Sequence, residues 1–141
     1  MVYGAYNFPY VGFYSLKGGE MEKRWSCFID DTYYEVRGGD LLFSRDRTFG
    51  QVLDVAINDR YVFVLYLDIL LSQYDAKVSE QSYANKICVF DHLGNRISRL
   101  DLDCRIGHFT ISSNGLDIYG IAQLPEFSIV KFEMPQELLG D

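Results

Sequence analysis

The sequence predicts an all-β fold made of consecutive units of about four antiparallel strands each. Aromatic residues make up 16% of the chain, with 11 Tyr and 10 Phe, and such side chains favour pleated, half-buried surfaces. Short apolar runs alternate with Asn- and Gly-containing turns, which is typical of β-hairpins. Segments of the chain also match one another at fixed shifts, which indicates a repeated unit.

Three internal comparisons define this unit. Residues 51–67 match residues 107–123, and both contain a short strand, an Asn-containing turn and a longer apolar strand. Residues 2–16 match residues 118–132, where two Tyr-Gly pairs and two prolines coincide. We interpret the paired glycines as packing positions that admit an aromatic ring from a neighbouring sheet. A third overlap, between two Gly-containing hairpins, completes a unit of four strands, named a to d.

Applied to the whole chain, the unit predicts ten strands in three groups within a single partial β-propeller domain, residues 1–141. The groups span residues 2–28, which lack strand a, residues 51–103, which have all four strands, and residues 108–134, which lack strand d. The predicted strands are 2–7, 11–16 and 20–28, then 51–58, 61–67, 86–91 and 96–103, then 108–113, 116–123 and 128–134.

Polarity within the unit favours stacked sheets, as in propeller blades. Strand b of the middle group is apolar from Val62 to Tyr66, so both of its faces need to be covered. Strand d of the first group instead alternates apolar with polar or charged residues, which is typical of a half-exposed outer strand. We therefore predict an array of about two and a half to three four-stranded blades. A β-sandwich is the alternative.

Two long loops, residues 29–50 and 68–85, interrupt the repeat. We predict a hairpin of residues 32–36 with 40–43 in the first loop, and a helical turn at residues 72–79 in the second. Successive antiparallel strands reverse direction, so both loops should leave the same face of the blades. Loops of this length within a compact domain are usually functional or disordered.

Residues 49–134 resemble the closing blades of the TolB-like six-bladed β-propellers, especially uncharacterised gut-bacterial members of that family. The resemblance is carried by four runs, which are YVFVLY at 61–66, ICVFDHLGN at 87–95, LDIYGIA at 116–122 and IVKF at 129–132. It implies a ring of more than twice this length and an exported, often lipid-anchored protein. It implies no catalytic residues.

This chain departs from the family in two respects. It begins inside a strand b, and its first residues lack the basic and apolar regions of a signal peptide. As written, we therefore expect a cytoplasmic chain. It would be either a fragment of a longer propeller protein or a shorter relative that closes its ring in another way.

Composition argues against several classes of function. The net charge of −7 repels phosphate backbones, so we expect no nucleic-acid partner. No apolar run is long enough to predict a membrane span. The three cysteines, Cys27, Cys88 and Cys104, form no Cys-x-x-Cys pair and lie far from both histidines in sequence. We predict free thiols and no zinc site.

Candidate ligand-binding residues lie near the starts of strands a, beside the predicted central channel. They are Arg45, Arg47 and His108. Four side chains carry oxygen atoms of the kind that bind metal ions, namely Asp30, Asp31, Asp54 and Asn58. Their spacing matches no calcium loop, and the turn explains Asn58, so we predict no metal site.

No nucleophile elbow, P-loop or Cys/His pair appears, so we predict no catalytic residues and no cofactor. The function predicted is a non-enzymatic module that binds a small molecule or a protein. The alternatives are a metal-dependent hydrolase or lactonase-like propeller, and a truncated, non-functional fragment of a longer propeller protein. The missing outer strands leave open edges, which predict self-association as a two-fold dimer that approximates a six-bladed ring.

Overall fold

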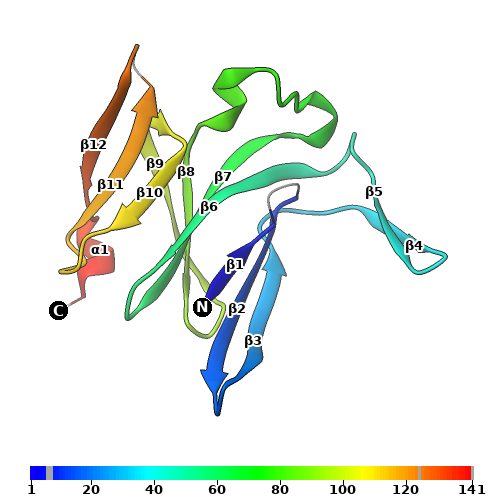
Figure 1. Cartoon of the computed structure of the whole chain (residues 1–141), viewed down its shortest axis with the longest axis horizontal. Coiled ribbons are helices and arrows are strands. Elements are labelled where there is room, and N and C mark those ends of the chain that lie inside the picture. The colour runs from blue at the N-terminus through cyan, green and yellow to red at the C-terminus, as the bar shows by residue number, and fades with distance from the viewer. Residues whose placement is uncertain (6–7, 124, 141) are drawn as a thin grey trace.

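A four-stranded antiparallel sheet forms the centre of the structure (Figure 1). The computed structural model describes residues 1–5, 8–123 and 125–140. The strands of the central sheet, in spatial order, are β6 (Phe49–Ile57), β7 (Tyr61–Leu70), β8 (Ala84–Asp91) and β9 (Arg96–Ile106). Consecutive strands are neighbours throughout, which is the order that the repeated unit predicts.

A three-stranded antiparallel sheet lies on each side of the central sheet (Figure 1). The N-terminal sheet consists of β1 (Val2–Gly4), β2 (Tyr10–Lys17) and β3 (Glu20–Phe28). The C-terminal sheet consists of β10 (His108–Ile111), β11 (Asp117–Gln123) and β12 (Phe127–Glu133). The N-terminal sheet contacts the central sheet through β1 and β2, which both lie against β6. The C-terminal sheet contacts it through β10, which lies against β6, and β11, which lies against β9. The three groups of predicted strands are therefore present as three blade-like sheets.

The remaining elements lie in the loops and at the C-terminus. A hairpin of β4 (Tyr34–Arg37) and β5 (Asp40–Phe43) projects from the body, and we call it the arm (Figure 1). Two short 3₁₀-helices, η1 (Leu71–Gln73) and η2 (Ser79–Ser82), replace the single helical turn predicted at residues 72–79. A four-residue helix, α1 (Gln136–Leu139), ends the chain, and no helix in the described ranges is long and apolar enough to cross a membrane.

The predicted strands are all found, with different ends. β1 ends at Gly4, and the last predicted residues of that strand, 6–7, lie outside the described residues.

The predicted turn between β6 and β7 is confirmed, because Oδ1 of Asn58 accepts hydrogen bonds from the backbone N–H groups of Arg60 and Tyr61 at 3.0 and 2.8 Å. Such a side-chain bond to the backbone two residues on closes a tight turn.

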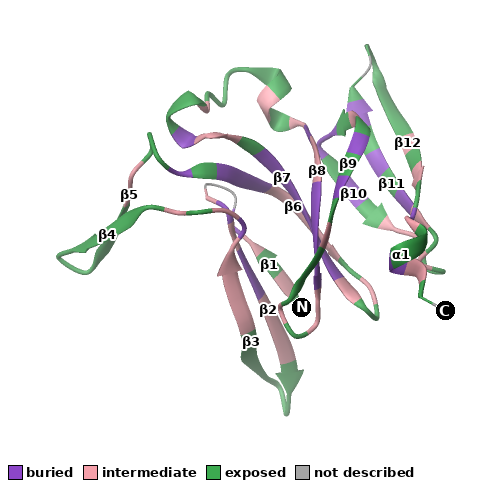
Figure 2. Cartoon of the chain, turned by 180° about the vertical axis from the view of Figure 1, so that it is seen from behind, coloured by how far each residue is buried: buried purple, intermediate pink, exposed green. Residues whose placement is uncertain are grey.

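β7 is buried on both faces, as its continuous apolar run predicts. Four consecutive residues, from Val62 to Leu65, are 0% exposed. Alternate residues enter two separate apolar clusters, Val62, Val64 and Tyr66 on the side of the N-terminal sheet, and Phe63, Leu65 and Leu67 on the side of the C-terminal sheet. Figure 2 shows this burial concentrated in the central strands. The result is three layers, which differs from the two layers of the β-sandwich alternative.

Two glycines let the outer sheets approach their neighbours closely. A Cβ atom added to Gly4 on β1 would lie 2.5 Å from Cγ1 of Val52, and one added to Gly120 on β11 would lie 2.8 Å from the side chain of Ile106. These are the two glycines that the internal repeat aligned. The packing role is confirmed, but the expected aromatic partners are wrong, because the neighbours are aliphatic. Branched side chains fill these narrow gaps without the width of a ring.

The single tryptophan joins the N-terminal sheet to the central sheet. Trp25 on β3 lies beside Phe13 and Phe90, with ring centroids 5.8 and 5.6 Å away. Its indole N–H donates a hydrogen bond to the backbone oxygen of His92 at 3.1 Å. The ring also lies against Gly94, where an added Cβ would be 2.9 Å from the indole. The indole therefore holds the β8–β9 turn against β3.

Gly120→Ala is expected to lower the free energy of unfolding by about 1–3 kcal/mol, because its methyl group overlaps the side chain of Ile106. Ile106→Ala alone should cost about 2–5 kcal/mol, because that side chain is fully buried. In the double variant the methyl group added at position 120 enters the space that Ile106 vacates. The double variant should therefore lose less free energy of unfolding than the sum of the losses in the two single variants. Urea denaturation of the four proteins measures this coupling, and strictly additive losses would contradict the close approach.

Candidate functional site

The two long loops meet on one face of the molecule. The guanidinium of Arg45 donates a hydrogen bond to the backbone oxygen of Leu71 at 2.7 Å, and the backbone N–H of Ser72 donates to the oxygen of Arg45 at 3.0 Å. The N–H of Leu71 donates to the oxygen of Thr48 at 2.9 Å. These bonds fix the segment before β6 against the segment after β7.

A cleft of about 290 Å³ lies among the residues that flank this junction, and we call it the loop-face cleft. Its lining combines acidic, basic and aromatic side chains from three parts of the chain. The lining residues are Asp30, Asp31, Tyr33, Arg47, Phe49 and Asp68. Tyr33 and Arg47 also line a second hollow of about 530 Å³ that runs along the arm. The cleft therefore adjoins the base of the arm.

Arg47 supplies the cation of the cleft. Its guanidinium carbon lies 3.9 Å from the centre of the Tyr33 ring, which is a cation–π contact. Thr48 supports Tyr33 in turn, since its buried hydroxyl lies 3.3 Å from both the backbone N–H and the backbone oxygen of Tyr33. No ion pair joins the Arg47 side chain to another described residue. Its N–H groups are therefore free to bind a ligand.

Asp30 supplies a half-buried carboxylate. Burial raises the pKa of this carboxyl above its usual range, and the charge of Asp68 raises it further. The guanidinium of Arg96 and the ammonium of Lys86 act in the opposite direction without overcoming the burial. Among the described residues, no side chain forms an ion pair with Asp30 or Asp31. Ionised Asp30 therefore lacks the partner that a half-buried charge requires.

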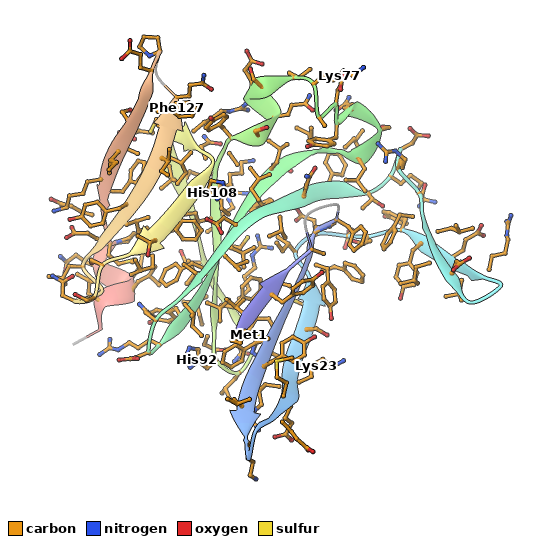
Figure 3. All side chains as sticks on the ribbon, in the orientation of Figure 1. Met1, Lys23, Lys77, His92, His108 and Phe127 are labelled. Atoms are coloured by element: carbon orange, nitrogen blue, oxygen red, sulfur yellow. The ribbon has the colours of Figure 1, made fainter. Side chains whose placement is uncertain are left out.

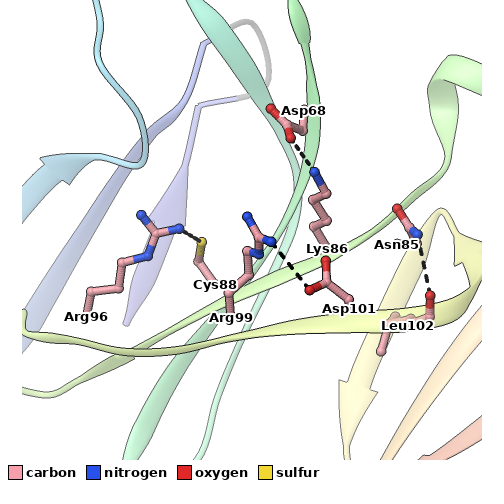
Figure 4. Close-up of polar contacts among 8 residues, drawn as sticks. All are labelled: Asp68, Asn85, Lys86, Cys88, Arg96, Arg99, Asp101 and Leu102. Atoms are coloured by element: carbon pink, nitrogen blue, oxygen red, sulfur yellow. Dashed lines mark hydrogen bonds and ion pairs between the residues drawn. The ribbon is translucent and has the colours of Figure 1, made fainter.

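The third carboxylate of the cleft is already paired, because Asp68 on β7 forms an ion pair with Lys86 on β8 (Figure 4). A second cation lies behind Asp30. Arg96 donates hydrogen bonds to the backbone oxygen of Ile29 at 3.2 Å and to Sγ of Cys88 at 2.9 Å. The first of these bonds positions the residue that precedes Asp30. Residues of the central sheet therefore hold the wall of the cleft.

Burial raises the pKa of the Cys88 thiol, so Cys88 acts as a neutral acceptor for Arg96. Cys27, Cys88 and Cys104 are all free, as predicted. In the described part of the chain, no group of three or more His, Cys, Asp or Glu side chains is arranged to hold a metal ion.

The structure separates the three residues predicted to bind ligand. Arg47 lines the cleft, and Arg45 lies at the loop junction, where its side chain is bound to a backbone oxygen. His108 lies elsewhere, on β10 (Figure 3), with Nδ1 3.4 Å from Oδ2 of Asp54. The same carboxylate accepts a hydrogen bond from the N–H of Phe109 at 3.0 Å. Asp54 therefore links the central sheet to the C-terminal sheet.

Sequence reasoning did not identify Tyr33, Phe49 and Asp68 as site residues, and it considered Asp30 and Asp31 only as metal ligands. A signal was present, because the two loops were predicted to leave the same face. Side chains near the ends of those loops are the ones that converge in the cleft.

No protein-family model matches this chain, and no curated protein matches it. The resemblance to TolB-like propellers therefore stays a prediction. Any function has to be argued from the residues of the cleft and from the surfaces of the three sheets.

Asp30→Asn is expected to raise the thermal stability at about pH 7. The pKa of Asp30 is raised in the folded state, so the ionised carboxylate destabilises the fold at any pH above that pKa. This destabilisation disappears as the pH falls through the raised pKa toward the pKa of an unfolded Asp, about 3.9. The gain in melting temperature should therefore shrink toward about pH 3. Thermal denaturation across this range measures it, with Asp40→Asn at the exposed turn of the arm as control. A loss of stability at neutral pH would contradict the assignment.

Proposed function

We propose that this chain is a non-enzymatic binding module whose ligand site is the loop-face cleft. In this proposal the three sheets are blades of a partial TolB-like propeller, as the sequence resemblance implies. The observation that carries the proposal is that the cleft holds Arg47 and Asp30 without ion-pair partners among the described residues, and that both lie next to the central sheet. Binding residues commonly lie on loops that a rigid scaffold positions.

The size and chemistry of the cleft favour a small polar ligand. Its volume of about 290 Å³ lies at the lower end of the range of about 300–1,000 Å³ that is usual for ligand pockets. Four of its six lining side chains are charged, and the other two are aromatic. Such a lining supplies hydrogen bonds and stacking surface. It contains none of the Ser, Thr, Cys, Lys or His side chains that commonly act as nucleophiles, and the proposal is therefore one of binding.

Ligand binding is tested by titrating the isotopically labelled chain with mixtures of polar metabolites, including amines, carboxylic acids, amino acids and sugars. At least one mixture is expected to shift the backbone resonances of Asp31, Tyr33 and Arg47. Arg47→Gln should abolish the response. Arg37→Gln is the matched control, because that exposed arginine lies on the arm and pairs with Glu35. If no mixture shifts these resonances, the proposal fails.

A second proposal, supported by a different observation, is self-association. The outer faces of the two flanking sheets carry exposed apolar side chains, with Ile129 80% exposed, Phe127 72% and Tyr3 53%. Among the described strands, β1 pairs only with β2 and β12 pairs only with β11. We propose that the outer face of the N-terminal sheet packs on the outer face of the C-terminal sheet of a second copy. Two such contacts, related by a two-fold axis, would close a ring of six sheets.

Light scattering at micromolar concentration is expected to give twice the chain mass of 16.3 kDa. Ile129→Lys should shift the protein to the monomer, because it places a charge in the proposed interface, while its exposure allows the fold to be kept. Leu93→Lys is the control, since Leu93 is 83% exposed in the β8–β9 turn. A clean monomer for the unaltered chain would contradict the dimer.

A further inference from the structure

The loop-face cleft holds opposite charges that do not neutralise each other. Arg47, Asp30 and Asp31 line the same small cavity, yet the structure describes no ion pair between the arginine and either aspartate. Arg47 is held on the ring of Tyr33 instead. The cleft therefore has one cationic group and a pair of anionic groups that are kept apart within a volume of about 290 Å³.

Each of these groups has a preferred ligand chemistry. A guanidinium that is stacked on an aromatic ring keeps its N–H edge available, and that edge matches the two oxygens of a carboxylate. The carboxylates of Asp30 and Asp31 match an ammonium group, which offers three N–H donors. Asp68 cannot serve this purpose in the same way, because it already pairs with Lys86.

The rest of the lining is aromatic. Phe49 is 45% exposed and Tyr33 is 40% exposed, so both offer ring surface to a bound molecule. An apolar ligand side chain that covered this surface would gain about 25 cal/mol per Å² removed from water. The cleft therefore favours a ligand that has two opposite charges and an apolar part.

We infer that the loop-face cleft binds a free amino acid with an apolar or aromatic side chain. Its ammonium lies between the carboxylates of Asp30 and Asp31, and its carboxylate lies on the guanidinium of Arg47. This inference rests on the proposed ligand-binding function and names the class of ligand. Such a cleft would distinguish free amino acids from peptides. The terminal residue of a peptide carries either the ammonium or the carboxylate beside its side chain, but not both.

The electrostatics of Asp30 support this assignment. A bound ammonium would stabilise the ionised carboxylate, whose pKa is raised by burial and by the charges of Asp68 and Asp31, with Arg96 and Lys86 acting against them. Affinity should therefore fall as the pH drops through the raised pKa of Asp30. A ligand that bound through Arg47 alone would not show this dependence.

The experiment compares three probes by calorimetry and by chemical-shift mapping on the full chain. L-Phenylalanine carries both charges, L-phenylalaninamide lacks the carboxylate, and N-acetyl-L-phenylalanine lacks the ammonium. Loss of either charge is expected to weaken binding about tenfold or more, which is typical of a lost charged hydrogen bond. Arg47→Gln should remove the difference between phenylalanine and its amide. Asp30→Asn should reduce the difference between phenylalanine and the N-acetyl compound.

The outcomes separate this inference from the broader proposal. Equal binding of all three probes would overturn the inference, because it would show that neither charge is recognised. Tighter binding of the amide or of the N-acetyl compound would also overturn it and would leave a cleft that recognises a peptide end. Absence of phenylalanine binding, while another metabolite shifts the cleft resonances, would also overturn it and leave the binding function intact. Failure of every metabolite at the cleft would overturn both. Arg37→Gln and Asp40→Asn, two exposed changes on the arm, serve as controls.

Discussion

The burial of β7 on both faces is the constraint on which the rest of the structure depends. A single extra sheet could cover only one face of this strand, so the chain supplies two, one from each of its ends. Each flanking sheet then has one covered and one uncovered face. The antiparallel pairing of β6 with β7 places the loop before β6 beside the loop after β7, and the charged cleft forms there.

Most of the fold could be predicted from the sequence, because it is encoded locally. The apolar run of β7 and the turn residue Asn58 each act within a few neighbours along the chain, and each has the structure that its pattern predicts. The alternation predicted for β3 holds only in part, because Trp25 and Cys27 pack against an apolar cluster whereas Met21 is 62% exposed. The aligned glycines predicted close packing between sheets. They could not reveal whether the partner would be a ring or a branched side chain, because that depends on which strand lies opposite.

The candidate site was less predictable, since it depends on contacts between loops that have no periodic pattern. Arg47 is predicted as a ligand-binding residue, but its stacking on Tyr33 and its nearness to Asp68 depend on how the loop of residues 29–50 folds on itself and against the end of β7. His108 is predicted in the same group because it lies at the start of a predicted strand a. In the structure, His108 lies away from the cleft and contacts the Asp54 carboxylate, which also binds the N–H of Phe109 on β10. Asp54 lies at a register shift in β6. His108 is therefore part of a link between two sheets.

The position of Trp25 has a spectroscopic consequence. The chain has one tryptophan, and it lies where the N-terminal sheet meets the β8–β9 turn. Its fluorescence emission therefore reports on that junction alone, whereas far-ultraviolet circular dichroism reports on the strands of all three sheets. A red shift in emission that precedes the loss of the dichroism signal would identify the N-terminal sheet as a separately detaching unit. Coincident changes would instead indicate that the three sheets unfold as one cooperative body.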